Sequence, residues 1–351
     1  MLKKNEKKGL KIYLGTVFGI TLLMGFLVRK AFLQNLDVSQ YAIVQMLYPA
    51  MGVMIAVFFT NKDFFQKAKH LYWTYLIAGT VCILLLIFYT IFGSSMFAEL
   101  RFYTGLIGSL LMYLWIFFMD NPTRKRSGFS LGNQNLFRFI KYVFLFFAYR
   151  LLSLVCSDGY LFLAGERTIS DLSRMIETLP STSVVVLKTL LLFIPRFFEN
   201  FIFFFGEEYG WRSFLQPLLQ KRFGICRGLI LVGIIWSVWH LPLTLYYYAP
   251  ESPLQEITAR IVSGICLSFV MGYFYMKLNS VWLPAAMHFL YNNFILLYLS
   301  PKEAAQSITS GIISWPDVAV FSVIMFVLTI PFFVMCHRMK EKCVGTPKLC
   351  E

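Results

Sequence analysis

The sequence predicts an all-α protein, a polytopic bundle of helices that crosses a membrane about ten times. Its 351 residues are 58% hydrophobic and only 14% charged, and the mean hydropathy is +0.65. This composition is too apolar for a soluble domain. Apolar runs long enough to span the hydrocarbon core recur along the whole chain. The segments between these runs are rich in Lys and Arg, as expected for loops that remain in the cytoplasm.

The predicted spans alternate with basic segments along the chain. A cluster of lysines precedes the first span, and no Ala-x-Ala-like cleavage site follows it, so we interpret it as an uncleaved helix rather than a signal peptide. With an even count of about ten spans, both termini and the basic segments fall on one side, which the positive-inside rule identifies as cytoplasmic. The predicted spans cover approximately residues 12–28, 41–60, 72–92, 102–119, 142–156, 184–205, 229–247, 257–276, 282–299 and 318–336.

We expect a single membrane domain with three parts. Residues 1–183 would form accessory transmembrane helices, and residues 184–300 would form the core that carries the polar motifs described below. Residues 301–351 would add the last transmembrane helix and a basic cytoplasmic tail. This organisation predicts a multi-pass protein of a cell membrane, in this case a bacterial plasma membrane.

Charge and cysteine content narrow the function classes. The net charge of +14 could indicate nucleic-acid binding, but the basic residues lie between apolar runs, where membrane topology explains them better. We therefore expect no nucleic-acid partner. The seven cysteines include no Cys-x-x-Cys pair. Cys82, Cys156 and Cys266 lie inside apolar runs, where we expect them to serve as packing residues.

An acidic motif, Gly-Glu-Glu-Tyr-Gly-Trp-Arg at residues 206–212, directly follows a strongly apolar run. Carboxylates at bilayer depth cost roughly a few kcal/mol each, so they indicate a functional site by default. On a helix, Glu207 and Glu208 point about 100° apart, whereas Glu208 and Arg212 share a face and can pair. Glu207 then remains free to point elsewhere. The structural alternative is an ion-pair cluster at a helix end, and we expect residues 212–219 to continue as an amphipathic turn.

Two of the four histidines, His240 and His288, lie inside apolar runs. His288 precedes Asn292 by four residues, so both project from one helix face. A single histidine on an apolar face is usually a satisfied core residue. These polar groups all need partners in hydrocarbon, however, and their least costly arrangement is to meet. Ser237 is interpreted as structural, because no acid partner accompanies it.

Together these residues are sufficient for hydrolysis of an acyl bond. A carboxylate and an imidazole can hold and deprotonate a water molecule. A second imidazole and an amide N–H can stabilise the tetrahedral oxyanion. This chemistry requires no serine or cysteine nucleophile.

Three motifs carry these residues in a fixed order: Glu207-Glu208-x-x-x-Arg212, Trp236-x-x-x-His240 and His288-x-x-x-Asn292. In combination they resemble the motifs of the CPBP family of intramembrane proteases, the CAAX-processing and bacteriocin-processing group also called Abi. The resemblance covers about residues 184–299. The second motif of that family usually begins with Phe, whereas this sequence has Trp, which also provides an aromatic wall.

The resemblance implies a role for each residue. Glu207 would be the general base and His240 would help to orient the water, while His288 and Asn292 would form the oxyanion site. The second glutamate and the arginine of the first motif would be a supporting pair. The family was first called metal-dependent, and two histidines with glutamates could bind zinc. Because no His-Glu-x-x-His motif is present and glutamate–water chemistry needs no metal, we expect no cofactor and keep zinc as the alternative.

The predicted function is an intramembrane endopeptidase that hydrolyses a peptide bond in a peptide precursor or a lipid-modified protein near the cytoplasmic face. Its expected partners are that substrate and the lipid bilayer. A second hypothesis is a catalytically idle family member that acts as a membrane scaffold, regulator or immunity protein. A third is a transporter with a proton relay, which the absence of an inverted repeat disfavours. We expect the four catalytic candidates to meet in one polar cavity nearer the cytoplasmic side.

Overall fold

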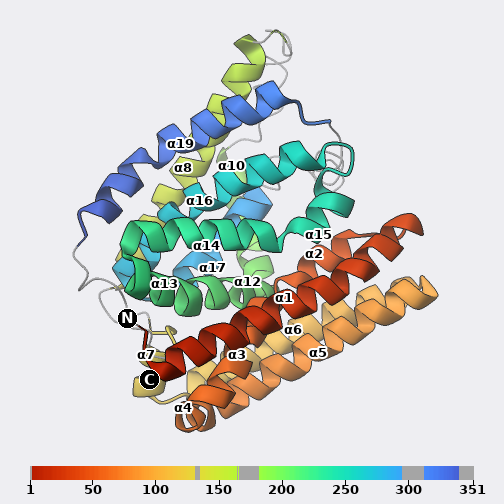
Figure 1. Cartoon of the computed structure of the whole chain (residues 1–351), viewed down its shortest axis with the longest axis vertical. Helices are drawn as coiled ribbons and strands as arrows, with labels where there is room; N and C mark the ends of the chain where they lie inside the picture. Colours follow the sequence, from red (N-terminus) through yellow and green to blue (C-terminus); the bar gives the residue numbers. More distant parts are fainter. Residues whose placement is uncertain (1, 131–134, 164, 166–181, 295–311, 340–351) are drawn as a thin grey trace.

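The computed structural model describes residues 2–130, 135–163, 165, 182–294 and 312–339, and throughout these ranges the secondary structure is helical, without a strand (Figure 1). Within these ranges, seven helices are long and apolar enough to cross a membrane, or eight if one bent helix pair forms a single span. The predicted all-α, polytopic helical bundle is therefore confirmed. The protein is a multi-pass membrane protein.

Most of the predicted spans are found as helices. The bent pair consists of α14 (Ile225–Trp239) followed by α15 (Leu241–Leu243) and η3 (Thr244–Tyr248), with a 44° change of direction between them. The seven complete spans are α1 (Lys4–Leu33), α2 with α3 (Ser39–Gln45 and Tyr48–Thr60), α5 (Lys69–Phe92), α6 (Ser95–Phe118), α8 (Asn135–Leu163), α16 (Pro253–Leu278) and α19 (Trp315–His337).

The spans predicted at 184–205 and 282–299 do not appear as complete spans among the described residues. The first is divided, with Pro195 and Asn200 at its breaks, into α10 (Thr182–Lys188), η1 (Thr189–Phe193), α11 (Ile194–Glu199) and α12 (Phe201–Glu208). The second contains α17 (Trp282–Asn293), and its residues 295–299 lie outside the described residues. The remaining short helices are α4 (Lys62–Lys67), α7 (Asn121–Arg126), η2 (Tyr209–Leu215) and α13 (Gln216–Phe223).

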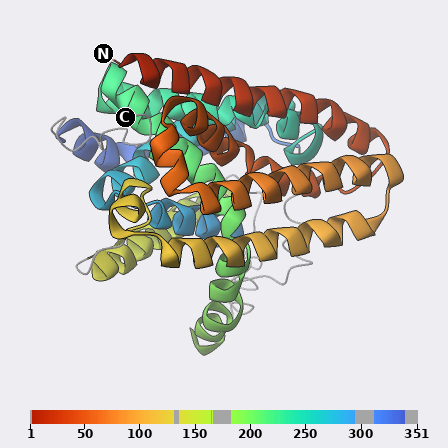
Figure 2. The ribbon, with the colours of Figure 1, turned by 90° about the horizontal axis from the view of Figure 1, so that it is seen from below.

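The basic segments gather at one end of the bundle, as the predicted topology requires. Lys221 at the end of α13 pairs with Glu6 at the start of α1 (2.7 Å), and the Arg126 guanidinium of α7 lies 4.6 Å from the Phe64 ring of α4. Both views also place the first turn of α1 and the last turn of α19 at this end (Figures 1 and 2). We call it the basic end. Its assignment to the cytoplasm remains a prediction from the positive-inside rule.

The centre of the bundle is the continuous segment formed by α12, η2 and α13. Every residue from Phe201 to Gln220 is buried, so the amphipathic turn expected at 212–219 is wrong. Glycines allow this close packing: a Cβ on Gly206 would collide with the Tyr75 hydroxyl, and one on Gly210 with Pro49. Two polar side chains of the segment bond to α16, Arg212 to Ser268 Oγ and Gln216 to the Gly272 carbonyl.

The N-terminal helices are part of this packing. Tyr13 of α1 contacts the rings of Trp211 and Phe214, and α3 supplies Pro49 against Gly210. The helices within 1–183 therefore help to bury the central segment, and the boundary between accessory helices and core at residue 183 remains a prediction.

Gly210→Ala is expected to destabilise the fold, because its Cβ would overlap the Pro49 ring and backbone. Overpacking of this kind costs about 1–3 kcal/mol. Thermal unfolding in detergent measures the effect. Gly19→Ala on α1, where a Cβ meets nothing within 4 Å, is the matched control and should not lower the unfolding temperature, because Ala is the better helix former. An equal response of the two variants would contradict this packing.

Candidate functional site

A cavity of about 660 Å³ lies where α2, α12, α16 and α17 meet the bend between α14 and η3. Its volume suits a small ligand or a short peptide segment. Four predicted site residues contribute to its wall: Glu207, His240, His288 and Asn292. The structure thus brings together residues that are up to 85 positions apart in sequence, from Glu207 to Asn292.

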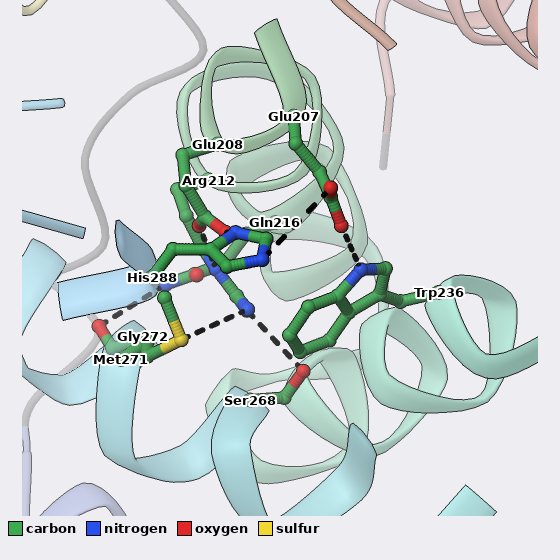
Figure 3. Close-up of polar contacts among 9 residues, drawn as sticks. All are labelled: Glu207, Glu208, Arg212, Gln216, Trp236, Ser268, Met271, Gly272 and His288. Carbon is green, nitrogen blue, oxygen red and sulfur yellow. Dashed lines mark hydrogen bonds and ion pairs between the residues drawn. The ribbon is translucent and has the colours of Figure 1, made fainter. Parts of the chain in front are cut away.

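The adjacent glutamates at the end of α12 point in different directions, as their helical spacing predicts (Figure 3). Both are buried. Glu207 lines the cavity, whereas Glu208 turns toward Arg212 and His288. The two carboxylates therefore have separate environments, and only Glu207 is available to a molecule in the cavity.

Glu208 is held by two cationic or polar partners. Arg212 Nε donates to Glu208 Oε2 (2.9 Å), and His288 Nδ1 bonds to Glu208 Oε1 (2.8 Å). The guanidinium is itself anchored on α16, where Nη1 donates to Ser268 Oγ (3.2 Å). Such a fully buried pair is tolerable only when its remaining hydrogen-bonding groups are also satisfied. The predicted pairing of Glu208 with Arg212 is present, and it includes His288 as a third member.

The local backbone helps to place Arg212. The residue lies in η2, a π-helix that follows α12 directly and extends from Tyr209 to Leu215. Short π-helical insertions are rare and occur often at functional sites. Here the wider turn carries a buried arginine between α12 and α16, so that it reaches both Glu208 and Ser268 (Figure 3).

His288 lies between the two glutamates. Its Nε2 is 4.0 Å from Glu207 Oε2 while its Nδ1 is bonded to Glu208. A separation of 4.0 Å is too long for a direct hydrogen bond, but one water molecule about 2.8 Å from each atom can bridge them. The ring of His288 is therefore oriented from one side by Glu208 and presents its other nitrogen beside Glu207.

Trp236 has a role that the sequence did not reveal. We interpreted it as an aromatic wall, but its indole Nε1–H also donates to Glu207 Oε1 (Figure 3). The Arg212 guanidinium lies 5.1 Å from the Trp236 ring. The only available signal was the replacement of Phe by Trp in the second motif, since Phe has no N–H to donate.

His240 lies at the bend where α14 ends and Pro242 begins α15. Its Nδ1 bonds to the Trp236 carbonyl (2.9 Å), so this nitrogen carries the proton in that bond. Nε2 has no polar partner among the described residues and belongs to a side chain that lines the cavity. Ser237 bonds to the backbone carbonyls of Gly233 and Arg260, which agrees with its structural interpretation.

Asn292 lies one turn beyond His288 on α17 and is exposed in the cavity wall. Its amide forms no hydrogen bond with the described part of the chain, in contrast to neighbouring Asn293, which donates to the Phe289 carbonyl. An amide of this kind remains available to a bound molecule.

The depth of the cavity differs from the expectation. Its lining extends to Ser39, Glu256 and Phe321, which lie in the first two turns of α2, α16 and α19. These helices all begin at the end opposite the basic end. The cavity therefore extends through the half of the bundle away from the basic end, and the expected position nearer the cytoplasmic side is wrong if the basic end is cytoplasmic. The bend at His240 lies beside the cavity in this half of the bundle.

Metal binding was the alternative for this site. Within the ranges that the structure describes, no group of three or more His, Cys, Asp or Glu side chains could hold a metal ion. Glu208 is already bonded to Arg212 and His288, which makes it a poor additional ligand. Metal independence remains a prediction that an experiment must test.

Glu208→Gln is expected to lower stability, because it removes the negative charge that compensates buried Arg212. Loss of one partner from a buried pair typically costs about 3–5 kcal/mol. Folded yield and thermal unfolding in detergent report this change. Glu99→Gln, at an exposed position on α6, provides the control. Wild-type stability of Glu208→Gln would show that the pair does not contribute to the fold.

Comparison with known proteins agrees with the three motifs. Residues 188–294 match the family model described as type II CAAX prenyl endopeptidase Rce1-like. The chain is also similar to CAAX prenyl protease 2 of Methanococcus maripaludis, with 41% identity over 51 residues, which cover 14% of this chain and 19% of that protein.

The match to this relative thus spans about a fifth of its length, while the family model includes all the site residues from Glu207 to Asn292. The polar cavity, the order of the motifs and the family model lead to the same conclusion. Residues 188–294, which carry the site, are therefore similar to the Rce1-like CAAX prenyl endopeptidase family.

Proposed function

We propose that the protein is an intramembrane endopeptidase that hydrolyses a peptide bond in a peptide precursor or a lipid-modified protein. The observation that carries this proposal is the position of Glu207. It is a buried carboxylate in the cavity wall, held by Trp236 and 4.0 Å from His288 Nε2. The name of the relative, CAAX prenyl protease 2, supports a protease and adds a lipid-modified protein as a substrate class.

In this mechanism Glu207 is the general base. It removes a proton from a water molecule held between its carboxylate and the neighbouring imidazoles, and the water oxygen attacks the peptide carbonyl carbon. When the C–N bond breaks, Glu207 returns the proton to the leaving amine. Glu208 does not take part in these proton transfers, because its carboxylate is bonded to Arg212 and His288.

The polar side chains on α17 stabilise the tetrahedral intermediate. The amide of Asn292 and Nε2 of His288 lie on the same helix face and can donate to the developing oxyanion, His288 as the imidazolium, because its Nδ1–H already donates to the Glu208 carboxylate. His240, at the bend after α14, orients the water through its cavity-facing nitrogen. In both histidines Nδ1 is already bonded, to Glu208 for His288 and to the Trp236 carbonyl for His240, so Nε2 is the nitrogen left to act in the cavity.

Glu207→Gln is expected to reduce turnover by a factor of about 100 or more, because the amide cannot accept the proton. Folding should be little affected. The test is comparative peptidomics of membranes from a null strain and from strains carrying wild type, Glu207→Gln or the Glu99→Gln control. Peptides that differ between the null and wild-type strains identify the substrate, and their amounts in the variants report turnover. A purified-protein assay with a strong chelator tests metal dependence in parallel, and we expect most of the activity to remain.

Identical peptide profiles for the wild-type and null strains would instead support the catalytically idle scaffold. Activity abolished by chelator and restored by zinc would replace the glutamate mechanism with a metal mechanism.

Trp236→Phe is expected to keep the aromatic wall and remove the indole donor to Glu207. A hydrogen bond to a charged group contributes roughly 1.5–3 kcal/mol, so kcat should fall at least about tenfold, with little change in KM. Steady-state kinetics on the substrate found by peptidomics provide the test. Trp315→Phe, an exposed position at the start of α19, is the matched control. Wild-type kcat for Trp236→Phe would exclude this positioning role.

A further inference from the structure

The cavity wall contains one ion pair outside the three motifs. Glu256 and Arg260 lie four residues apart on α16, bonded through Arg260 Nη2 and Glu256 Oε1. Both side chains line the cavity and are partly exposed to it, by 16% and 22%. A helix-surface pair of this spacing usually contributes only a few tenths of a kcal/mol, and here it lies in the wall of a mostly apolar cavity. Its position suggests a role for the pair beyond helix stability.

The Arg260 guanidinium is held in place by several contacts. It lies 4.1 Å from the centre of the Tyr248 ring, a distance typical of a cation–π interaction. The backbone carbonyl of Arg260 accepts a hydrogen bond from Ser237 Oγ (2.8 Å), and this bond joins α16 to α14. Nη2 bonds to Glu256. Nη1 has no hydrogen-bond partner among the described residues, so the immobilised guanidinium retains a donor group.

Arg260 also lies beside the proposed catalytic residues. Tyr248, which contacts the guanidinium, also contacts the His240 ring (6.2 Å between centroids). Ser237, which bonds to the Arg260 backbone, lies one turn from His240 and next to Trp236. Arg260 is therefore adjacent to the His240 side of the site, and Glu256 lies one turn farther toward the opposite end of the bundle.

We propose that Arg260 is a specificity-determining residue that binds a carboxylate of the substrate peptide, a proposal that rests on the protease function. Guanidinium groups bind carboxylates through paired, charge-assisted hydrogen bonds. The remaining wall, including Tyr247, Tyr291 and Leu243, suits an apolar peptide segment. The carboxylate is either the C-terminus of the peptide or an Asp or Glu side chain near the scissile bond.

Glu256 has two effects in this arrangement. It neutralises Arg260 when the cavity is empty, which reduces the cost of burying a cation. It also repels an incoming carboxylate, because like charges at short range oppose binding. Removing the Glu256 charge should therefore strengthen the binding of acidic peptides, whereas removing the Arg260 charge should weaken it.

Binding of four defined peptides to the full-length protein tests the proposal. The probes are acetyl-Ala-Leu-Ala-Leu as free acid and as amide, and acetyl-Ala-Leu-Glu-Leu and acetyl-Ala-Leu-Gln-Leu, both as amides. Equilibrium dialysis in detergent uses the Glu207→Gln background to prevent cleavage. We expect at least one acidic peptide to bind about tenfold or more tightly than its neutral counterpart, in line with a charged hydrogen bond. The first pair reports a C-terminal carboxylate, and the second a side-chain carboxylate.

Added substitutions assign the preference to Arg260. Arg260→Met should abolish it, and Glu256→Gln should increase it. Arg222→Gln, at an exposed position near the end of α13 at the basic end, removes the same charge outside the cavity and should leave the preference unchanged. An unfolded Arg260→Met protein would also lose the preference for acidic peptides. It would not account for the higher affinity expected of Glu256→Gln, so the two variants together distinguish a lost contact from lost folding. Equal binding of acidic and neutral peptides, or a preference that survives Arg260→Met, would overturn the proposal.

The cleavage assay separates this inference from the proposed function. If the acid preference depends on Arg260 but wild type cleaves nothing, the binding site is supported and the protease function fails. If cleavage depends on Glu207 but neither cleavage nor binding distinguishes acidic from neutral peptides, the protease function remains and the Arg260 inference is wrong.

Discussion

The buried network of Glu208, Arg212 and His288 is the interaction on which the rest of the site depends. Two adjacent carboxylates in the middle of an apolar bundle would be prohibitively costly without compensation. Glu208 obtains it from Arg212 on η2 and from His288 on α17, and Arg212 is tied in turn to Ser268 on α16. One carboxylate is thereby used to hold helices together. The other, Glu207, is left at the cavity wall with a donor from Trp236.

The packing of the bundle encloses this network on one side and leaves a cavity on the other. Gly206 and Gly210 let the central segment approach Tyr75 and Pro49 closely, so the network is enclosed on the side of the N-terminal helices. On the other side, the 44° bend after Trp239 lies beside the cavity, whose wall includes residues of both η3 and α16. Tight packing therefore encloses the network on one side, and the cavity borders Glu207 on the other.

Local spacing in the sequence predicted part of this arrangement. The membrane-spanning helical class follows from composition, and the pairing of Glu208 with Arg212 follows from a separation of four residues. The bond between Glu208 and His288 joins positions 80 residues apart, so no local pattern contains it. The indole donor of Trp236 depends on side-chain orientation, which periodicity does not specify. The span predicted at 184–205 is divided at Pro195 and Asn200, and its apolar composition alone did not predict these breaks.

The central claim is that the two glutamates have different roles, Glu208 structural and Glu207 chemical. Double-mutant cycles of unfolding free energy measure this most directly, with each glutamate replaced by Gln and Arg212 by Met. The account predicts a coupling between Glu208 and Arg212 toward the upper part of the range of about 0.5–3 kcal/mol seen for contacting residues, and a much smaller coupling between Glu207 and Arg212. A strong coupling for Glu207, or none for Glu208, would contradict it.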